Sequence, residues 1–212
     1  MASEVDICNI ALGYLGDDAT VASIDPPEGS AQAEHCSRFY TIARDTFLDE
    51  HQWNFCTRRA LLAQLAATPP SPWAFGYAVP ADMIDVVAVL ANDARSDHSA
   101  GGPGISTYTP QPFVAEVDNT GSTVIYTNQL DATLRYTARV TDTAKFPPQF
   151  VNALAMKLAS LLAGPVLKGE TGIKAAMAWM ERADMALSKA KTSDANQQKQ
   201  EVAQSVSWMA NR

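Results

Sequence analysis

The sequence predicts an α+β protein, in which segments from both ends of the chain form a helical bundle around an inserted antiparallel β domain. Apolar residues recur at helical spacing within residues 1–69 and again within residues 143–191. Between them, residues 70–142 hold short β-branched runs separated by Gly, Pro and Asn. The polar segment that follows opens an extended C-terminal tail, predicted over residues 192–212.

Two helices are predicted in the first part of the bundle. Ser3 and Asp6 have the spacing of a capping box, and Gly16 is a favourable stop for the first helix. A longer amphipathic helix is predicted over residues 30–65, either continuous or bent near 51–55. Its apolar face is expected to contain Cys36, Phe39, Tyr40, Ala43, Phe47, Leu61 and Leu65. We expect this helix to act as scaffold, because its opposite side is charged and no reactive pattern interrupts it.

The proline-rich segment 68–72 cannot continue a helix, so it marks the predicted start of the β domain. Alternation and β-branched content predict strands at residues 73–79, 83–90, 113–117, 123–127 and 132–139. Residues 118–122 read as a hairpin turn. Residues 92–112 show no periodicity and are expected to be a long loop.

Helical spacing returns after Phe146, where Pro147 and Pro148 suit a first helical turn. Gly164-Pro165 is expected to end this helix, and a last helix follows over residues 173–187. Residues 192–200 are polar and are expected to leave the core. The apolar residues beyond them need a surface to lie on, and they are Val202, Val206, Trp208 and Met209.

The formal net charge of −7 argues against tight binding to duplex DNA. Residues 143–212 are the exception, with nine basic and five acidic side chains. No apolar run of the length of a membrane span and no signal peptide are expected, so folding in the cytosol is the default. The three cysteines lie among apolar residues and are expected to be buried thiols.

The sequence contains no complete motif for phosphate binding, zinc binding or acid–base catalysis. The segment 164–171 has the outline of a phosphate-binding loop, but Glu170 stands where the lysine is required. His35, Cys36, His51 and Cys56 lack the paired spacing of a zinc site. The adjacent pairs Asp17-Asp18 and Asp49-Glu50 point in different directions and do not form an acid–base pair. We therefore expect no catalytic residues, no cofactor and no metal.

A nucleic-acid contact remains a weaker alternative for the β domain. Arg135 and Arg139 lie on the polar face of one predicted strand, beside Tyr126 and Tyr136. Ordinary solvent-facing strand residues explain this pattern more simply.

A series of landmarks in the first 90 residues carries a family resemblance. They are Cys8-Asn9-Ile10-Ala11-Leu12-Gly13, Phe39-Tyr40, Ala43-Arg44-Asp45, His51-Gln52-Trp53-Asn54-Phe55-Cys56, Arg59-Ala60-Leu61-Leu62, Trp73 and Gly76-Tyr77-Ala78-Val79-Pro80-Ala81-Asp82. In order and spacing, the chain resembles the tail tubular protein A family, the head-to-tail adaptors of short-tailed phages. The later helices match only in general layout.

This resemblance implies a virion structural protein rather than an enzyme, assembled in the host cytoplasm. It implies a ring of twelve copies beneath the portal protein, which extends the DNA channel and carries the tail nozzle or tail fibre proteins. DNA would pass through the lumen without specific binding, and no membrane is involved. By position in the chain, Val202, Val206, Trp208 and Met209 are assigned to portal contact. The alternatives are a phage-associated hydrolase or a nucleic-acid-binding module in the β domain.

Overall fold

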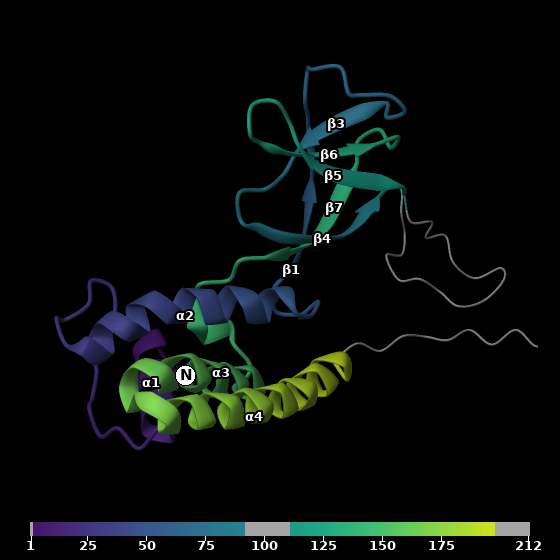
Figure 1. The fold of residues 1–212 in the computed structure, drawn as a ribbon. Coiled ribbons are helices and arrows are strands. Elements are labelled where there is room, and N and C mark those ends of the chain that lie inside the picture. Colours follow the sequence, from purple (N-terminus) through teal and green to yellow (C-terminus); the bar gives the residue numbers. More distant parts are fainter. Residues whose placement is uncertain (1, 92–110, 198–212) are drawn as a thin grey trace, which may run out of the picture. The chain divides into compact units, whose positions relative to one another are not determined.

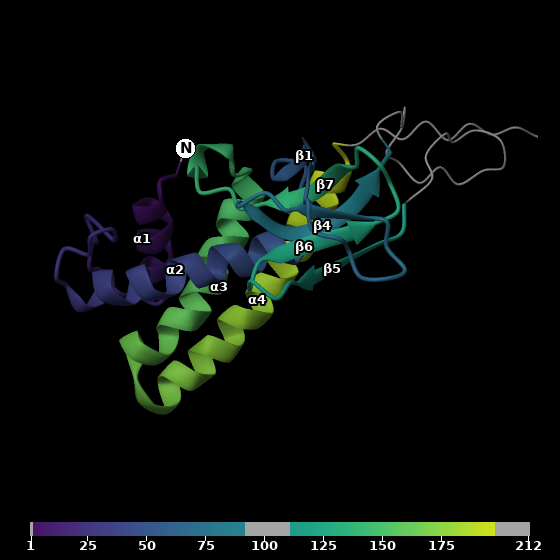
Figure 2. The same ribbon diagram turned by 90° about the horizontal axis from the view of Figure 1, so that it is seen from above.

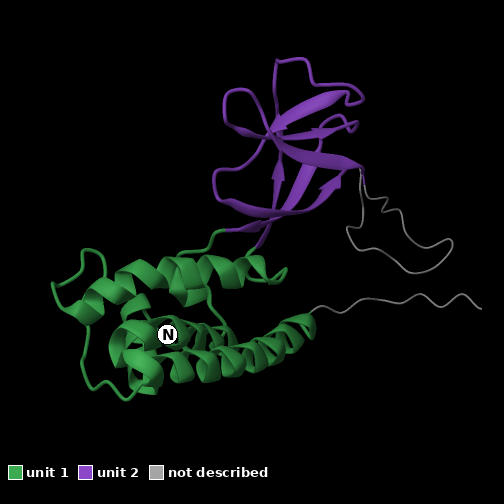
Figure 3. Ribbon diagram, in the orientation of Figure 1, with its two compact units in different colours: residues 1–56, 139–197 green, residues 57–138, 198–212 purple. Residues whose placement is uncertain are grey.

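A computed structural model describes residues 2–91 and 111–197, and it shows an α+β fold with two compact units (Figures 1 and 3). The helical unit contains residues up to 56 together with residues 139–197. Residues 57–138 form the β unit. The predicted fold class is confirmed, with helices from both ends of the chain and antiparallel sheets between them.

The helical unit is organised around one central helix. Its four helices are α1 (Glu4–Tyr14), α2 (Ala31–Asp49), α3 (Pro148–Leu167) and α4 (Gly169–Ala195), and a short 3-10 helix, η1 (Thr143–Lys145), precedes α3. Each of the other three helices packs against α3 (Figures 1 and 2). The predicted capping box of Ser3 and Asp6 is confirmed at the start of α1.

The composition of α3 explains its central place. Pro148 occupies its first turn, where a missing N–H costs nothing. Its buried residues are Phe150, Ala153, Leu154, Ala155, Leu158, Ala159, Ser160, Leu162 and Ala163. By length and composition alone this helix could cross a membrane, yet half of that segment is buried inside the unit. Its apolar surface is thus used for packing within the unit.

The turn between α3 and α4 lies slightly later than predicted. Helix α3 continues through Gly164 and Pro165 to Leu167, and Lys168 and Gly169 then reverse the chain at positive φ. Shortly after this turn, a Cβ added to Gly172 would lie only 2.8 Å from the carbonyl oxygen of Ala163. The absent side chain therefore permits the close approach of the two helices.

The prediction of a helix over residues 30–65 is wrong beyond residue 49. Helix α2 ends at Asp49, and residues 57–61 form a strand of the β unit instead. The first unit boundary falls accordingly after residue 56, not after 69, and the second falls after 138, not after 142. Leu61 matched the helical spacing, but it is 67% exposed on its strand. This segment is a strand because it pairs with another strand about 75 residues later. Local periodicity carries no information about such a distant partner.

The β unit contains two antiparallel sheets. Its strands are β1 (Thr57–Leu61), β2 (Ala63–Gln64), β3 (Phe75–Ala78), β4 (Met83–Leu90), β5 (Phe113–Val117), β6 (Thr123–Thr127) and β7 (Thr133–Ala138). The strand orders are β1-β7-β4 and β2-β3-β6-β5. The core between them is formed by Leu62, Tyr77, Val89, Ile125, Ala132, Leu134, Tyr136 and Ala138.

The five strands predicted between residues 73 and 139 are confirmed to within one or two residues at each end. Those predicted over 83–90, 113–117 and 123–127 have the same bounds as β4, β5 and β6. The first and last strands of the unit are hydrogen-bonded neighbours, with Thr57 opposite Thr137. The predicted long loop lies almost wholly in residues 92–110, outside the described residues.

The predicted detachment of the chain from residue 192 is wrong for its first part. Helix α4 continues to Ala195, and Asp194 is only 4% exposed. Asp194 follows Ala183, Leu187 and Ala190 at helical spacing, so it falls on the buried face of α4. Residues 198–200 lie outside the described residues.

We expect the Phe150→Ala variant to destabilise the helical unit by about 3–5 kcal/mol, since Phe150 is fully buried and a cavity would replace its ring. Urea unfolding followed by tryptophan fluorescence measures this loss. The exposed neighbour Gln149, changed to Ala, is the matched control and should shift stability by no more than about 0.5 kcal/mol. Equal effects of the two substitutions would contradict the packing described for α3.

Candidate functional site

The segment between α2 and β1 is held by a buried carboxylate. Asp194 of α4 accepts hydrogen bonds from the backbone N–H of Asn54, at 3.1 Å to each of its carboxylate oxygens. The Asn54 side-chain amide donates to the Asp194 carbonyl at 2.8 Å and to its Oδ2 at 3.1 Å. The imidazole Nε2 of His51 lies 3.4 Å from the same Oδ2. We call these three residues the Asp194 clamp.

Aromatic rings pack beside the Asp194 clamp. The Trp53 indole donates a hydrogen bond to the Phe47 carbonyl at 2.8 Å, and its ring meets the edge of Phe150 at 5.1 Å. Phe55 and Phe146 also contact Phe150, with centroid distances of 5.1 and 4.9 Å. Because the one polar atom of Trp53 is paired within the unit, this aromatic cluster is a packing element.

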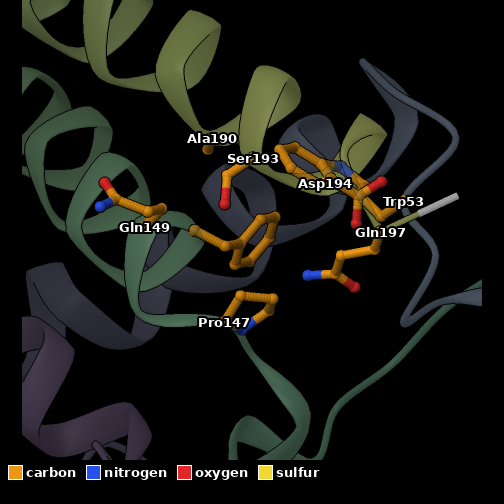
Figure 4. A pocket seen from close by; sticks show the side chains of 8 residues that line it. Trp53, Pro147, Gln149, Ala190, Ser193, Asp194 and Gln197 are labelled. Carbon is orange, nitrogen blue, oxygen red and sulfur yellow. The ribbon is translucent and has the colours of Figure 1, made fainter.

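A small cavity lies against the Asp194 clamp, between α3 and α4 (Figure 4). Its volume is about 10 Å³, and Trp53, Ser193 and Asp194 are among its lining residues. That volume holds about one water molecule and excludes a substrate. The clamp and its cavity therefore serve the fold of the helical unit.

The three cysteines are buried free thiols, as predicted. Hydrogen bonding with Cys36, together with burial, raises the pKa of Cys8, so this thiol stays protonated and unreactive. The Cys56 thiol donates to the carbonyl of Trp53 at 3.5 Å. Within residues 2–91 and 111–197, no group of three or more His, Cys, Asp or Glu side chains could hold a metal ion.

The candidate phosphate loop and the candidate arginine–tyrosine surface do not form sites in the structure. Segment 164–171 is the turn between α3 and α4, which is the interpretation favoured over a phosphate loop. Arg139 belongs to the helical unit and pairs with Asp45 at 3.1 Å, whereas the ring of Tyr136 is in the core of the β unit. The predicted arginine–tyrosine constellation is therefore not one exposed surface of the β unit.

The β unit carries a groove of about 530 Å³, a volume typical of ligand-binding clefts. The strand register explains its floor. Gly76 on β3 lies opposite Tyr126 on β6, and the next pairs along β6 place Val124 opposite Glu116 of β5. Paired residues share a sheet face, so these residues lie on the face opposite to the core residues Tyr77 and Ile125. The groove thus occupies the outer face of the four-stranded sheet.

The absent side chain of Gly76 lets the ring of Tyr126 pack onto β3. A Cβ at this position would lie 3.2 and 3.3 Å from two carbon atoms of the Tyr126 ring. The ring of Tyr126 therefore lies across the space that a side chain on β3 would fill. One wall is formed by Leu65, Pro69 and Pro70, and the other by the turn between β5 and β6.

The groove is acidic. Glu116 and Asp118 line it, and none of the described residues that line it is basic. Asp118 is held by its own turn, where its Oδ1 accepts bonds from the N–H of Thr120 and Ser122 at 2.8 and 3.0 Å and from the Thr120 hydroxyl at 2.6 Å. These hydrogen bonds lower the pKa of Asp118, so it stays ionised. Glu116 is exposed, and its side chain makes no hydrogen bond or ion pair with another described residue.

Large apolar side chains are exposed on the outer helix α4. Ile173 is 63% and Met177 is 71% exposed, and they are neighbours on the helix at a spacing of four. Met185 on α4 and Ile42 on α2 are further exposed apolar residues of the helical unit. A helix face of this kind fits contact with another molecule.

The residues assigned to portal contact, Val202, Val206, Trp208 and Met209, lie outside the described residues. Sequence patterns alone indicate neither the groove nor the Asp194 clamp. A glycine inside a strand indicates that another group approaches the backbone closely, and Gly76 is such a glycine in β3. Continuing the apolar stripe of α4 by two more turns beyond Leu187 would have placed Asp194 on the buried face.

The comparisons with known proteins give no further guide to this site. Neither a scan of protein-family models nor a search of curated proteins finds a match to this chain.

We expect Asp194→Ala to lower the free energy of unfolding by about 2–3 kcal/mol, because the backbone N–H of Asn54 would lose its acceptor inside the protein. Asp194→Asn, which keeps one oxygen acceptor, should cost less. Urea unfolding of the full chain provides the measurement. Asp184→Ala, at an exposed position of the same helix, is the control and should change little. A loss at Asp194 no greater than that at Asp184 would contradict the clamp.

Proposed function

We propose that this protein is a virion structural protein, a head-to-tail adaptor that forms a ring beneath the portal of a short-tailed phage. The ring extends the DNA channel and provides the platform on which the tail nozzle or fibres attach. This function needs a rigid subunit with exposed contact surfaces and no reaction centre.

One observation carries the proposal: the segments that resemble the adaptor family supply contacts that hold each unit together. Asn9 bonds to both the N–H and the carbonyl of Val21, at 2.8 and 3.0 Å. Segment 51–56 provides His51 and Asn54 of the Asp194 clamp, and the rings of Trp53 and Phe55 in the aromatic cluster. Asp82 pairs with Arg58 and accepts a hydrogen bond from Tyr136 at 3.1 Å. The resemblance thus falls on residues that determine the fold, which supports a shared architecture.

Two surface properties agree with this proposal. The exposed pair Ile173 and Met177 offers apolar area that a neighbouring subunit would cover. The net charge of −7 suits a conduit, since a strongly basic lining would retain passing DNA.

The hydrolase alternative has less support. Its acid–base pair would have to come from Glu116 and Asp118, yet the carboxylate of Asp118 is occupied by its own turn. A zymogram on cell-wall glycan that shows lysis, lost on Glu116→Gln, would favour it over the adaptor.

Ring assembly is the direct test. We expect mass photometry to show a large closed oligomer, either of the protein alone or after addition of portal protein from the same phage. A monomer under both conditions would contradict the proposal.

The exposed apolar pair of α4 gives a matched test of the subunit contact. Met177→Glu should reduce the oligomeric fraction at least about tenfold, because a charge would be buried in the contact. Ala178→Glu adds the same charge at the next exposed position and is the control. Circular dichroism should show both variants folded. Equal assembly of the two variants would exclude this pair from the ring contact.

The portal contact assigned to the C-terminal residues is tested separately. We expect Trp208→Ala, or a chain truncated after residue 200, to bind portal protein at least about tenfold more weakly, as for loss of an aromatic anchor. The thermal melting temperature of the truncated chain should equal that of the full chain. If truncation unfolds the protein, the segment stabilises its own chain and the assignment to portal is wrong.

A further inference from the structure

We propose that the groove on the outer face of the four-stranded sheet binds an extended segment of a partner protein, one with an arginine or lysine side chain between apolar residues. This inference concerns the β unit alone and does not depend on ring formation by the protein. It assigns a role to Tyr126 and Glu116, which line the groove.

The shape of the groove suits a side chain entering from outside. The floor is formed by the ring of Tyr126, which packs over Gly76, and by Val124 next to it. Val124 is buried, so the floor is a packed surface rather than a gap between mobile side chains. Tyr126 is half-buried, so an inserted side chain would contact the part of its ring that faces the groove.

The charge of the groove selects the kind of side chain. Among the described residues, two carboxylates and no basic side chain line the groove, so a polyanion such as nucleic acid is repelled. A guanidinium or ammonium group gains from both the carboxylate of Glu116 and the aromatic face of Tyr126. Asp118 adds to this field while its own oxygen stays bonded in the turn. Arginine or lysine is therefore the residue class that complements the groove.

The walls indicate a peptide rather than a free cation. Leu65, Pro69 and Pro70 line one side, and Val117, 69% exposed, stands at the other. Apolar walls gain little from a small hydrated cation, but they bury the neighbours of a basic residue in an extended chain. Strand β5 is also an edge of the sheet among the described strands, which offers backbone groups to such a chain.

The test uses the full-length protein and a set of fluorescein-labelled pentapeptides. Each peptide has arginine at its centre and Val, Leu, Pro or Tyr at the flanking positions, and each is matched by the same peptide with uncharged citrulline. Fluorescence anisotropy at physiological salt should show binding of arginine peptides at least tenfold tighter than that of their citrulline partners. Glu116→Gln and Tyr126→Leu should each weaken this binding at least fivefold. Glu181→Gln, an exposed glutamate of the helical unit, should leave it unchanged.

Three results would overturn the proposal. The first is that no arginine peptide binds better than its citrulline partner at concentrations up to 1 mM (roughly the weakest affinity of interest). The second is equal binding by the Glu116→Gln and Glu181→Gln proteins. The third is full competition by free arginine amide at the affinity of the peptides, which would make the groove a small-cation site. Because mass photometry reports assembly independently, failure here leaves the ring proposal standing, and failure of the ring leaves this test valid.

Discussion

The contact between Asp194 and the Asn54 backbone holds together three parts of the chain that are far apart in sequence. The start of α3 carries Phe150, the end of α4 carries Asp194, and the turn after α2 carries Trp53 and Phe55. A buried carboxylate is stable only when its oxygens are hydrogen-bonded, and here one backbone amide and one side-chain amide satisfy them. The ending of α2 at Asp49 follows from this contact, because the next residues must turn to reach α4 and the aromatic cluster.

The two units use their polar groups differently. In the helical unit, the histidine, asparagine and aspartate that first suggest chemistry are bonded to one another, and the cysteines are enclosed. In the β unit, Tyr77 fills the core and bonds to the Gln129 carbonyl at 2.8 Å, while its neighbour Gly76 faces the groove. Adjacent residues of one strand thus lie on opposite faces, one in the core and one at the groove. The proposed adaptor role and the proposed peptide groove follow from this division, and they belong to separate units.

Much of the architecture was readable from local patterns, and the failures share a cause. The strands over 83–90 and 123–127 alternate or are β-branched, and α3 is marked by prolines at its start. The helix prediction failed for residues 57–65 because Leu61 and Leu65 continue the helical spacing by coincidence, whereas the pairing of Thr57 with Thr137 makes this segment a strand. The groove was missed because it depends on register across three strands, which no single stretch of sequence contains. Asp194 was missed because its partner lies 140 residues away.

The hydrogen-bonded pairing of β1 with β7 has an evolutionary consequence. Since the strand that enters the β unit and the strand that leaves it run side by side from Thr57 and Thr137, the insertion is attached through a two-stranded stem. A stem with adjacent ends lets the whole unit be exchanged, enlarged or replaced by a short hairpin without moving the helices that precede and follow it. Lineages that keep the helical scaffold can in this way acquire a new module by exchange of the segment between the two junctions, after residues 56 and 138.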